Sequence, residues 1–222
     1  MKLNTIDSDG QVAMRHAMVA SQLRTNAVSD ARVVAAMARV PREDYLPVEA
    51  QDMAYRDTAL PLGRGRFQNV PIATGRMLTE AVLQATDRVL LIGAAGGYTA
   101  AVLAEIVASV TAVESDPALA ALARTALVGS PKVTLVEGPL QAGHAEGGPF
   151  DVLFIDGAVE SIPDALVAQV ATGGRVVGGV ADRGVTRLAS GRKTAGGFAL
   201  LPFADIDCVP LPGFALAKSF TF

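Results

Sequence analysis

The sequence has little cysteine, few aromatic residues and no excess of basic charge. Cys208 is the single cysteine among 222 residues, which excludes a disulfide framework or a cysteine metal site within one chain. Tryptophan is absent, and 19 lysines and arginines do not exceed 22 aspartates and glutamates, so a nucleic-acid partner is not expected. His16 and His144 have no partners at metal-ligand spacing, so no metal site is expected.

Long apolar runs are also missing from the chain. No stretch approaches the roughly 20 apolar residues that span a bilayer, and residues 1–10 lack the apolar core of a signal peptide. We therefore expect a soluble cytoplasmic protein that contacts no membrane. Half of the residues are hydrophobic and 18% are charged, which is typical of a globular chain. These features leave the oligomeric state open.

The clearest motif is an apolar run that leads into a glycine-rich turn. Residues 88–92 predict a buried strand, residues 93–97 contain three glycines, and a helix is expected from Tyr98. The turn brings the N-terminus of a helix to the carboxyl edge of the sheet, where nucleotides bind in open α/β folds. The next expected strand ends in Glu114, at the spacing of an acid that receives ribose hydroxyls.

Strand and helix patterns alternate from residue 88 onward, which predicts a parallel sheet with right-handed crossovers. Strands are expected at residues 88–92, 110–114, 132–136, 151–155 and 174–180. Helices are expected at residues 98–108, 117–128 and 162–170. Beyond residue 180, short β-like runs at 185–188, 198–203 and 214–222 predict antiparallel strands at one edge. Before residue 88, helices are expected at 11–23, between Asp30 and Pro41, and at 74–85. Residues 60–71 lack periodicity and predict a long ordered loop.

The glycine-rich turn distinguishes between two classes of cofactor. The dinucleotide fingerprint Gly-x-Gly-x-x-Gly would need glycine at 93, 95 and 98, but two of these are Ala95 and Tyr98. The frame Gly-x-Gly-x-Gly, used by S-adenosylmethionine (SAM) methyltransferases, matches at Gly93 and Gly97. Glu114 would serve either cofactor through its ribose.

Several stretches together resemble the protein-L-isoaspartate O-methyltransferase family. They occur in the family's order, extend from about Met14 to the C-terminus, and comprise 18–23, 40–47, 54–57, 60–63, 89–104, 149–151, 162–163, 169 and 173–175. The resemblance implies a class I SAM-dependent methyltransferase (Rossmann-like) α/β fold. That fold has a mostly parallel sheet, an antiparallel C-terminal edge and an N-terminal helical cap. It also implies methyl transfer to isoaspartyl carboxylates of damaged proteins or peptides, a protein-repair activity.

The resemblance divides one domain, residues 1–222, into three parts. Residues 1–86 would hold helices and the substrate loop, 87–180 the cofactor-binding core, and 181–222 the C-terminal β region. Asn69 would take the catalytic position, with Gln68 and Pro71 as substrate-binding residues. The cofactor-binding residues expected on the core are Gly93, Ala94, Ala95, Gly97, Tyr98, Glu114, Gly138, Pro139 and Asp156.

The chain departs from the family's motifs at ligand-binding positions. The typical loop motif Gly-Gln-Thr-Ile-Ser-x-Pro reads Gly-Arg-Phe-Gln-Asn-Val-Pro at residues 65–71, so Asn69 replaces the serine. The acid two residues before the first glycine is Leu91, the middle glycine is Ala95, and Gly-Asp-Gly after the third strand is Gly-Pro-Leu at 138–140. Asp156 is expected to face the cofactor's cationic end in place of the acid missing at Leu91.

These departures keep three functions open. The first is isoaspartyl methylation, for which Asn69 could still donate a hydrogen bond. The others are a catalytically degenerate or scaffold relative, and a methyltransferase with a different acceptor. Arg64 and Arg66 are expected to be solvated loop charges, with contact to an acidic substrate as the alternative. The enzymatic interpretation requires a cavity for an adenosyl group between Gly93 and Glu114.

Overall fold

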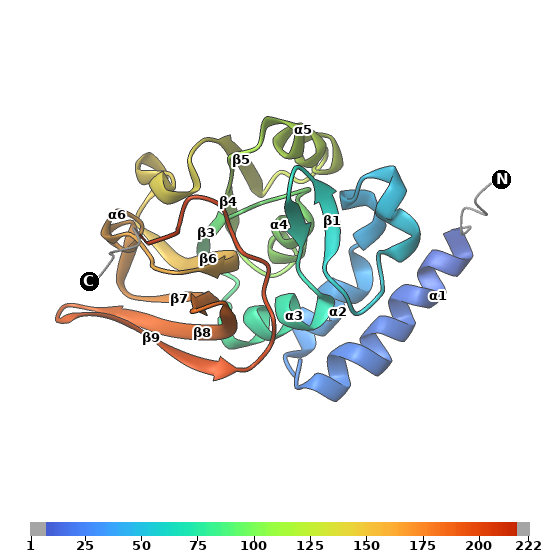
Figure 1. The fold of residues 1–222 in the computed structure, drawn as a ribbon, viewed down its shortest axis with the longest axis horizontal. Helices are drawn as coiled ribbons and strands as arrows, with labels where there is room; N and C mark the ends of the chain where they lie inside the picture. The colour runs from blue at the N-terminus through green and yellow to red at the C-terminus, as the bar shows by residue number, and fades with distance from the viewer. Residues whose placement is uncertain (1–7, 217–222) are drawn as a thin grey trace, which may run out of the picture.

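The computed structural model describes residues 8–216. Within these residues, one sheet has seven strands in the order β5-β4-β3-β6-β7-β8-β9 (Figure 1). Its strands are β3 (Arg88–Ile92), β4 (Ser109–Glu114), β5 (Val133–Glu137), β6 (Phe150–Val159), β7 (Val170–Asp182), β8 (Val185–Thr194) and β9 (Gly197–Ala204).

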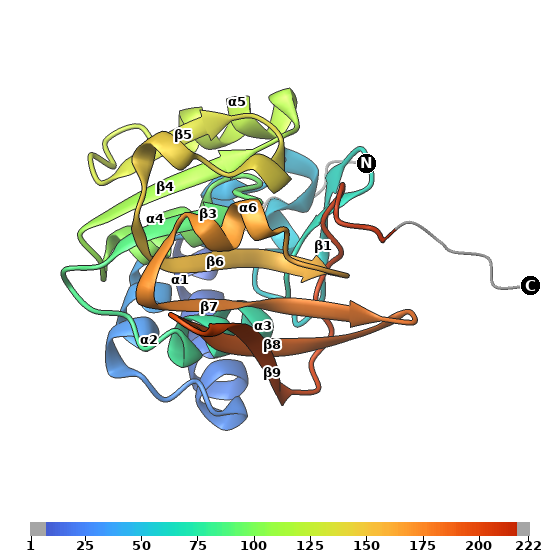
Figure 2. The ribbon, with the colours of Figure 1, turned by 90° about the vertical axis from the view of Figure 1, so that its left-hand side faces the viewer.

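The pairing of the strands follows the expected class I methyltransferase arrangement. Strand β3 lies parallel to both β4 and β6, and the parallel pairing continues outward to β5 and β7. Strands β8 and β9 add antiparallel pairs at the other edge. The mostly parallel sheet with an antiparallel C-terminal edge is therefore confirmed, and Figure 2 shows these strands as one layer.

The two faces of the sheet carry separate apolar clusters. Successive side chains of a strand point to opposite faces, so Val89 and Leu91 join one cluster while Leu90 and Ile92 join the other. Residues of five helices pack in the first cluster: α1 (Ser8–Met18), α2 (Ala31–Arg39), α3 (Pro71–Glu80), α4 (Tyr98–Ala104) and α5 (Pro117–Ala126). The second cluster contains residues of α6 (Asp164–Ala168) and of the segment after β9.

The boundaries of helices α2 and α3 follow from the residues at their ends. Asp30 caps α2 by accepting a hydrogen bond from the Arg32 backbone N–H, and the helix ends before Pro41. Helix α3 begins at Pro71, three residues before the predicted start, because proline is favoured in the first helical turn. It ends at Glu80, short of the predicted residue 85, and Val82 beyond it has φ 46°.

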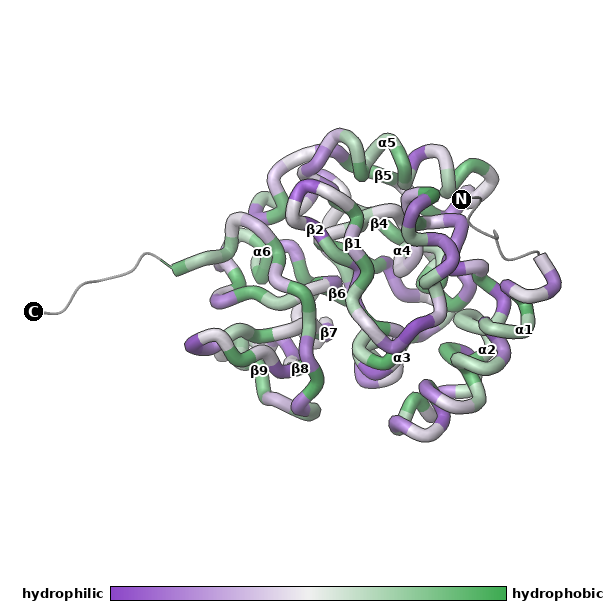
Figure 3. The backbone as a smooth tube through the Cα atoms, turned by 45° about the vertical axis from the view of Figure 1, so that its right-hand side comes forward, coloured by the Kyte–Doolittle hydropathy of each residue, from purple (hydrophilic) through white to green (hydrophobic). Residues whose placement is uncertain are grey.

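The prediction of a long loop at residues 60–71 was wrong. This stretch forms a hairpin of strands β1 (Leu60–Gly63) and β2 (Arg66–Gln68), a two-stranded sheet apart from the main one (Figure 3). The turn has positive φ at Gly63, Arg64 and Gly65, which the glycines adopt without strain. Alternation along β2 buries Arg66 and Gln68 and exposes Phe67.

The segment after β9 crosses the carboxyl edge of the sheet. The backbone N–H of Ala158 donates to the Val209 carbonyl at 2.7 Å, and the Leu211 N–H donates to the Ala158 carbonyl at 2.9 Å. Residues 214–216 of the predicted β-like run 214–222 are not in a strand, and residues 217–222 lie outside the described residues. The chain therefore covers its own sheet edge near the expected cofactor site.

Candidate functional site

The turn after β3 is built around positive φ angles. Gly93 and Gly97 have φ of 85° and 100°, and Ala95 has φ 49°. The backbone N–H groups of Gly93 and Ala94 both donate to the Val113 carbonyl at 3.0 Å, which ties the turn to the end of β4. Ala95 therefore holds the left-handed conformation that glycine adopts more easily.

Glu114 lies at the centre of the site and is completely buried. Its Oε2 accepts from the Ala95 N–H at 2.7 Å, and its Oε1 accepts from the backbone N–H groups of Ser115 and Asp116 at 2.8 and 2.9 Å. Arg66 also reaches the carboxylate, with Nη1 to Oε1 at 2.6 Å and Nη2 to Oε2 at 3.1 Å. The acid expected to receive ribose hydroxyls is therefore bonded to an arginine.

The expected solvation of Arg66 was thus wrong. Its side chain is 7% exposed and points from β2 into the edge of the main sheet. Sequence reasoning missed this contact because residues 60–71 carried no recognised strand, so the inward face of β2 could not be assigned.

Gly93 faces the edge of the sheet, where a leucine covers it. A Cβ built on Gly93 would meet Leu211 Cδ2 at 2.9 Å, and one on Gly157 would meet Leu211 Cγ at 2.5 Å. The expected open cavity between Gly93 and Glu114 is therefore filled in this conformation, by Leu211 over the glycine and Arg66 on the acid.

The other glycines of the turn face neighbouring elements. A Cβ on Gly97 would meet Leu127 at 3.0 Å, beyond the end of α5, so packing against that helix accounts for this glycine without a ligand. A Cβ on Gly96 would lie 2.0 Å from the Tyr45 carbonyl oxygen. Ala94 is buried, and Tyr98 opens α4 with its ring edge-on to Tyr45.

Asn69 and Asp156 meet beside this turn. Asn69 Nδ2 donates to Asp156 Oδ1 at 2.8 Å, and Thr99 Oγ1 donates to Asp156 Oδ2 at 2.5 Å. Asn69 Oδ1 accepts from the Val209 N–H at 2.8 Å. Burial raises the pKa of Asp156, and the hydrogen bonds from Thr99 and Asn69 oppose that rise. Both residues are therefore engaged with the protein itself.

Arg42 positions Asn69 and was missed in the sequence. It is fully buried, and its Nε donates to the Ala54 carbonyl at 2.8 Å while its Nη2 donates to the Asn69 carbonyl. The guanidinium lies 4.9 Å from the centre of the Tyr98 ring. The proline-bracketed segment 40–47 was the available signal, because it marks a fixed conformation around this arginine.

The two predicted substrate-binding residues differ in their surroundings. Gln68 is 5% exposed, and neither its Nε2 nor its Oε1 has a hydrogen-bond partner among residues 8–216. Buried amides are normally paired, so this side chain has spare capacity to bind a ligand. Pro71 is buried at the first position of α3, where helix initiation accounts for it.

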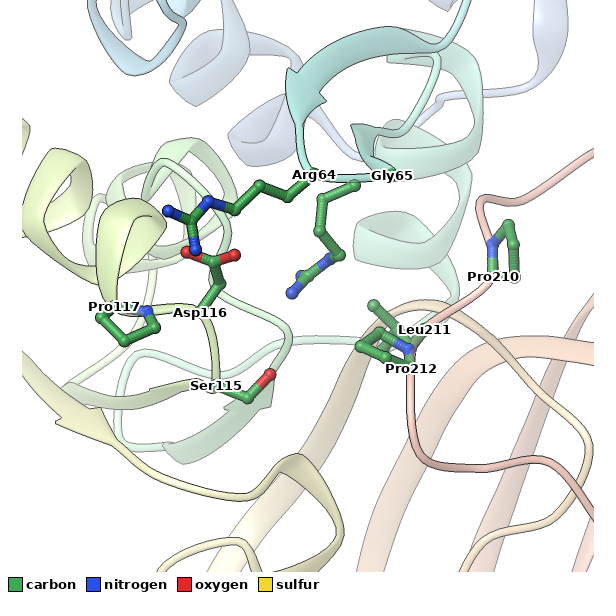
Figure 4. A pocket seen from close by; sticks show the side chains of 9 residues that line it. Arg64, Gly65, Ser115, Asp116, Pro117, Pro210, Leu211 and Pro212 are labelled. Carbon is green, nitrogen blue, oxygen red and sulfur yellow. The ribbon is translucent and has the colours of Figure 1, made fainter.

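Two clefts flank Ser115 and Pro212. The first, of about 450 Å³, has Arg64 and Asp116 on one side and Leu211 on the other (Figure 4). The second, of about 500 Å³, is lined by Glu137, Gly138, Pro139, Leu140 and Gln141. The predicted cofactor residues Gly138 and Pro139 thus lie on a cleft beside Glu114's strand.

Neither a membrane helix nor a metal cluster is found in the part of the chain that the structure describes. No helix within residues 8–216 is long and apolar enough to cross a membrane. The same residues contain no group of three or more histidine, cysteine, aspartate or glutamate side chains placed to hold a metal ion.

Comparison with known proteins identifies the family. The model of the protein-L-isoaspartate(D-aspartate) O-methyltransferase family matches residues 14–213. The chain is 38% identical over 211 residues to protein-L-isoaspartate O-methyltransferase 1 of Rhodopseudomonas palustris, covering 93% of this chain and 86% of that protein. The chain belongs to this methyltransferase family. A relative from Koribacter versatilis is 36% identical, with 93% and 94% of the two chains covered.

Solved structures agree with the fold of the family. A protein-L-isoaspartate O-methyltransferase structure matches with a TM-score of 0.79 at 22% identity, covering 90% of this chain and 66% of that chain. A Plasmodium falciparum structure in complex with S-adenosyl-L-homocysteine (SAH) matches with a TM-score of 0.76 at 18% identity, covering 89% and 97%. At these identities, the likeness establishes the class I methyltransferase fold.

The carboxyl edge of the sheet holds several features that would bind S-adenosylmethionine, the family's cofactor. A carboxylate at the end of β4, a glycine turn after β3 and a cleft at Gly138 are present on one edge of the sheet. Arg66 and Leu211 cover the carboxylate and the glycine in this conformation. The carboxylate, the glycine turn and the cleft therefore suit an adenosyl group, and Arg66 and Leu211 are the residues that cover them.

Proposed function

We propose that this chain is a SAM-dependent methyltransferase that acts on isoaspartyl carboxylates of damaged proteins or peptides. Membership of the family supports the reaction, with more than 90% of the chain covered by named relatives. The observation that carries the proposal is the meeting, at one edge of the sheet, of the Gly93 turn, Glu114 and the Asn69 segment. When bound, the cofactor supplies the methyl group.

The residues expected to hold the cofactor lie on, or directly after, the neighbouring strands β3, β4, β5 and β6. Glu114 would receive the ribose hydroxyls, and its fixed hydrogen bonds to backbone N–H groups keep the carboxylate in place. Gly138 and Pro139 line the second of the two clefts beside Ser115, where the adenine would bind. Asp156 lies at the edge next to the Gly93 turn and would face the cationic end, since Leu91 is buried in the core.

The acceptor requires positioning and no general base. A carboxylate is already ionised at neutral pH, so the protein contributes by orienting it for reaction. Gln68 is the strongest candidate for holding the acceptor peptide, because its buried amide has unused donors and an unused acceptor among the described residues. Asn69 would donate from its amide once its bond to Asp156 is released.

Methyl transfer to a synthetic isoaspartyl peptide tests the proposal directly. The control is the same peptide with a normal aspartate, which has the same charge and composition. We expect SAM-dependent methylation of the isoaspartyl peptide and little of the control. Binding of SAH without methylation of either peptide would contradict the acceptor and favour a methyltransferase with another substrate. A chain that neither binds SAH nor transfers methyl groups would support the scaffold alternative.

A further inference from the structure

The β1–β2 hairpin places a guanidinium on the acid assigned to the cofactor. Arg66 and Glu114 are 7% and 0% exposed, and two parallel N–H···O contacts of 2.6 and 3.1 Å join them. Bidentate arginine–carboxylate pairs are among the strongest charge-assisted hydrogen bonds. The family's typical loop motif has glutamine at this position, so the ion pair follows from a departure in this chain.

We propose that Arg66 sets the cofactor affinity of this chain by competing with the cofactor's ribose for Glu114. The inference rests on the proposed function, which assigns Glu114 to the ribose. A guanidinium edge and a ribose diol both present two neighbouring hydrogen-bond donors to a carboxylate, so they suit the same acceptor. The measured affinity is then the intrinsic affinity reduced by the fraction of chains in which Arg66 has left Glu114.

The construction of the hairpin allows Arg66 to leave. Strands β1 and β2 form their own sheet and pair with each other, not with the seven-stranded sheet. Added Cβ atoms at Gly63 and Gly65 meet nothing within 4 Å, so the tip is open on the described surface. Arg42 holds the Asn69 carbonyl at the base of the hairpin. A hinge between a fixed base and a free tip is the expected motion.

Binding of SAH to the full-length chain tests the competition. Titration calorimetry would compare wild type with R66Q, which restores the motif's glutamine, and with R66K, which keeps a positive charge beside Glu114. We expect R66Q to bind SAH at least tenfold more tightly, with R66K between R66Q and wild type. R66K protects the test if R66Q folds poorly, because any tightening relative to wild type supports the proposal.

R175Q is the matched control for the loss of a buried ion pair. Arg175 Nη2 contacts Asp87 Oδ1 at 2.6 Å, with side chains 15% and 5% exposed, at the opposite edge of the sheet. This variant should lose stability and bind SAH as wild type does. A similar tightening in R175Q would overturn the proposal, because loosening of the whole fold would then explain the effect.

Two further results would decide the matter. Equal SAH binding by R66Q, R66K and wild type would overturn the proposal. Weaker binding by both variants would overturn it too, and would make Arg66 a residue that supports the bound cofactor. Amide hydrogen exchange of residues 60–68 should rise when wild type is saturated with SAH, and unchanged exchange would also count against it. If R66Q binds SAH more tightly but does not methylate an isoaspartyl peptide, the proposed acceptor is contradicted. The competition between Arg66 and the ribose is still supported by that result.

Discussion

A partly buried ion pair and a fully buried one lie at opposite edges of the same sheet and differ in what surrounds them. Arg175 of β7 lies at the amino edge of the sheet. Its guanidinium donates to the Asp87 carboxylate and to the Val82 carbonyl, both in the segment between α3 and β3. Arg66 and Glu114 lie at the carboxyl edge, where Arg66 lines a cleft from a hairpin outside the main sheet. The first pair links the segment between α3 and β3 to strand β7, whereas the second occupies the acid assigned to the cofactor.

The largest expected effect comes from removing the acid of the second pair. In E114A, Arg66 would be left buried without its partner, and three backbone N–H groups would lose their acceptor. Breaking a buried pair in this way costs about 3–5 kcal/mol. Urea denaturation should show that the free energy of unfolding falls by this amount. A fall of less than about 1 kcal/mol would mean that Arg66 already turns to solvent.

The amino-edge pair should be less sensitive to substitution. In R175Q, Asp87 keeps its hydrogen bond from the Gln84 N–H at 2.7 Å, and the partly exposed arginine site admits water. We expect the free energy of unfolding to fall by about 1.5–3 kcal/mol, the range for a hydrogen bond to a charged group. Thermal denaturation with and without SAH would check it. A loss as large as that in E114A would remove the contrast between the two edges.

Asp156 provides a prediction with a defined dependence on pH. Burial raises its pKa above the ordinary value near 4, so the folded state binds this proton more tightly than the unfolded chain. Stability from this group is complete below the ordinary value and is lost as pH rises through the raised one. D156N removes the titration, so its stability relative to wild type should increase across that window. A difference in denaturation midpoints that stays constant as pH rises from about 4 would contradict the assignment.

The smallest effect concerns the glycine turn. Ala95 has φ 49°, a conformation that glycine adopts without a Cβ penalty. A95G should therefore stabilise the chain by about 0.5–1 kcal/mol. The neighbouring A94G is the control, since Ala94 is not among the residues with positive φ and glycine should destabilise it by a similar amount. Equal changes of the same sign in both variants would rule out strain at Ala95.

The α/β core was predictable because its patterns are local. Strand β3 begins and ends at the predicted residues, and Asp30 and Pro41 mark the limits of α2. Apolar runs and capping residues are set by neighbours within a few positions, so one sequence suffices to find them. The lengths of β6 and β7 were underestimated, because pairing with adjacent strands extends them beyond the apolar runs.

The closure of the site could not be predicted, because it depends on contacts between distant residues. Arg66 and Glu114 are 48 positions apart, and Asn69 and Asp156 are 87 apart. Glu114 ends β4 as predicted, whereas Asp156 lies within β6 and not at its end, as had been predicted. The sequence contained no signal that side chains of residues 60–71 would bond to these two acids. Leu211 covers Gly93 through a segment whose path is fixed by backbone bonds to Ala158.

A crystal structure of the wild-type chain grown with SAH would show directly whether Arg66 leaves Glu114 when the cofactor binds. We expect adenosyl density beside Glu114 and Gly138, with the Arg66 guanidinium moved beyond hydrogen-bond distance of the Glu114 carboxylate. SAH bound at this edge while Arg66 still holds Glu114 at the present 2.6 and 3.1 Å would contradict this expectation.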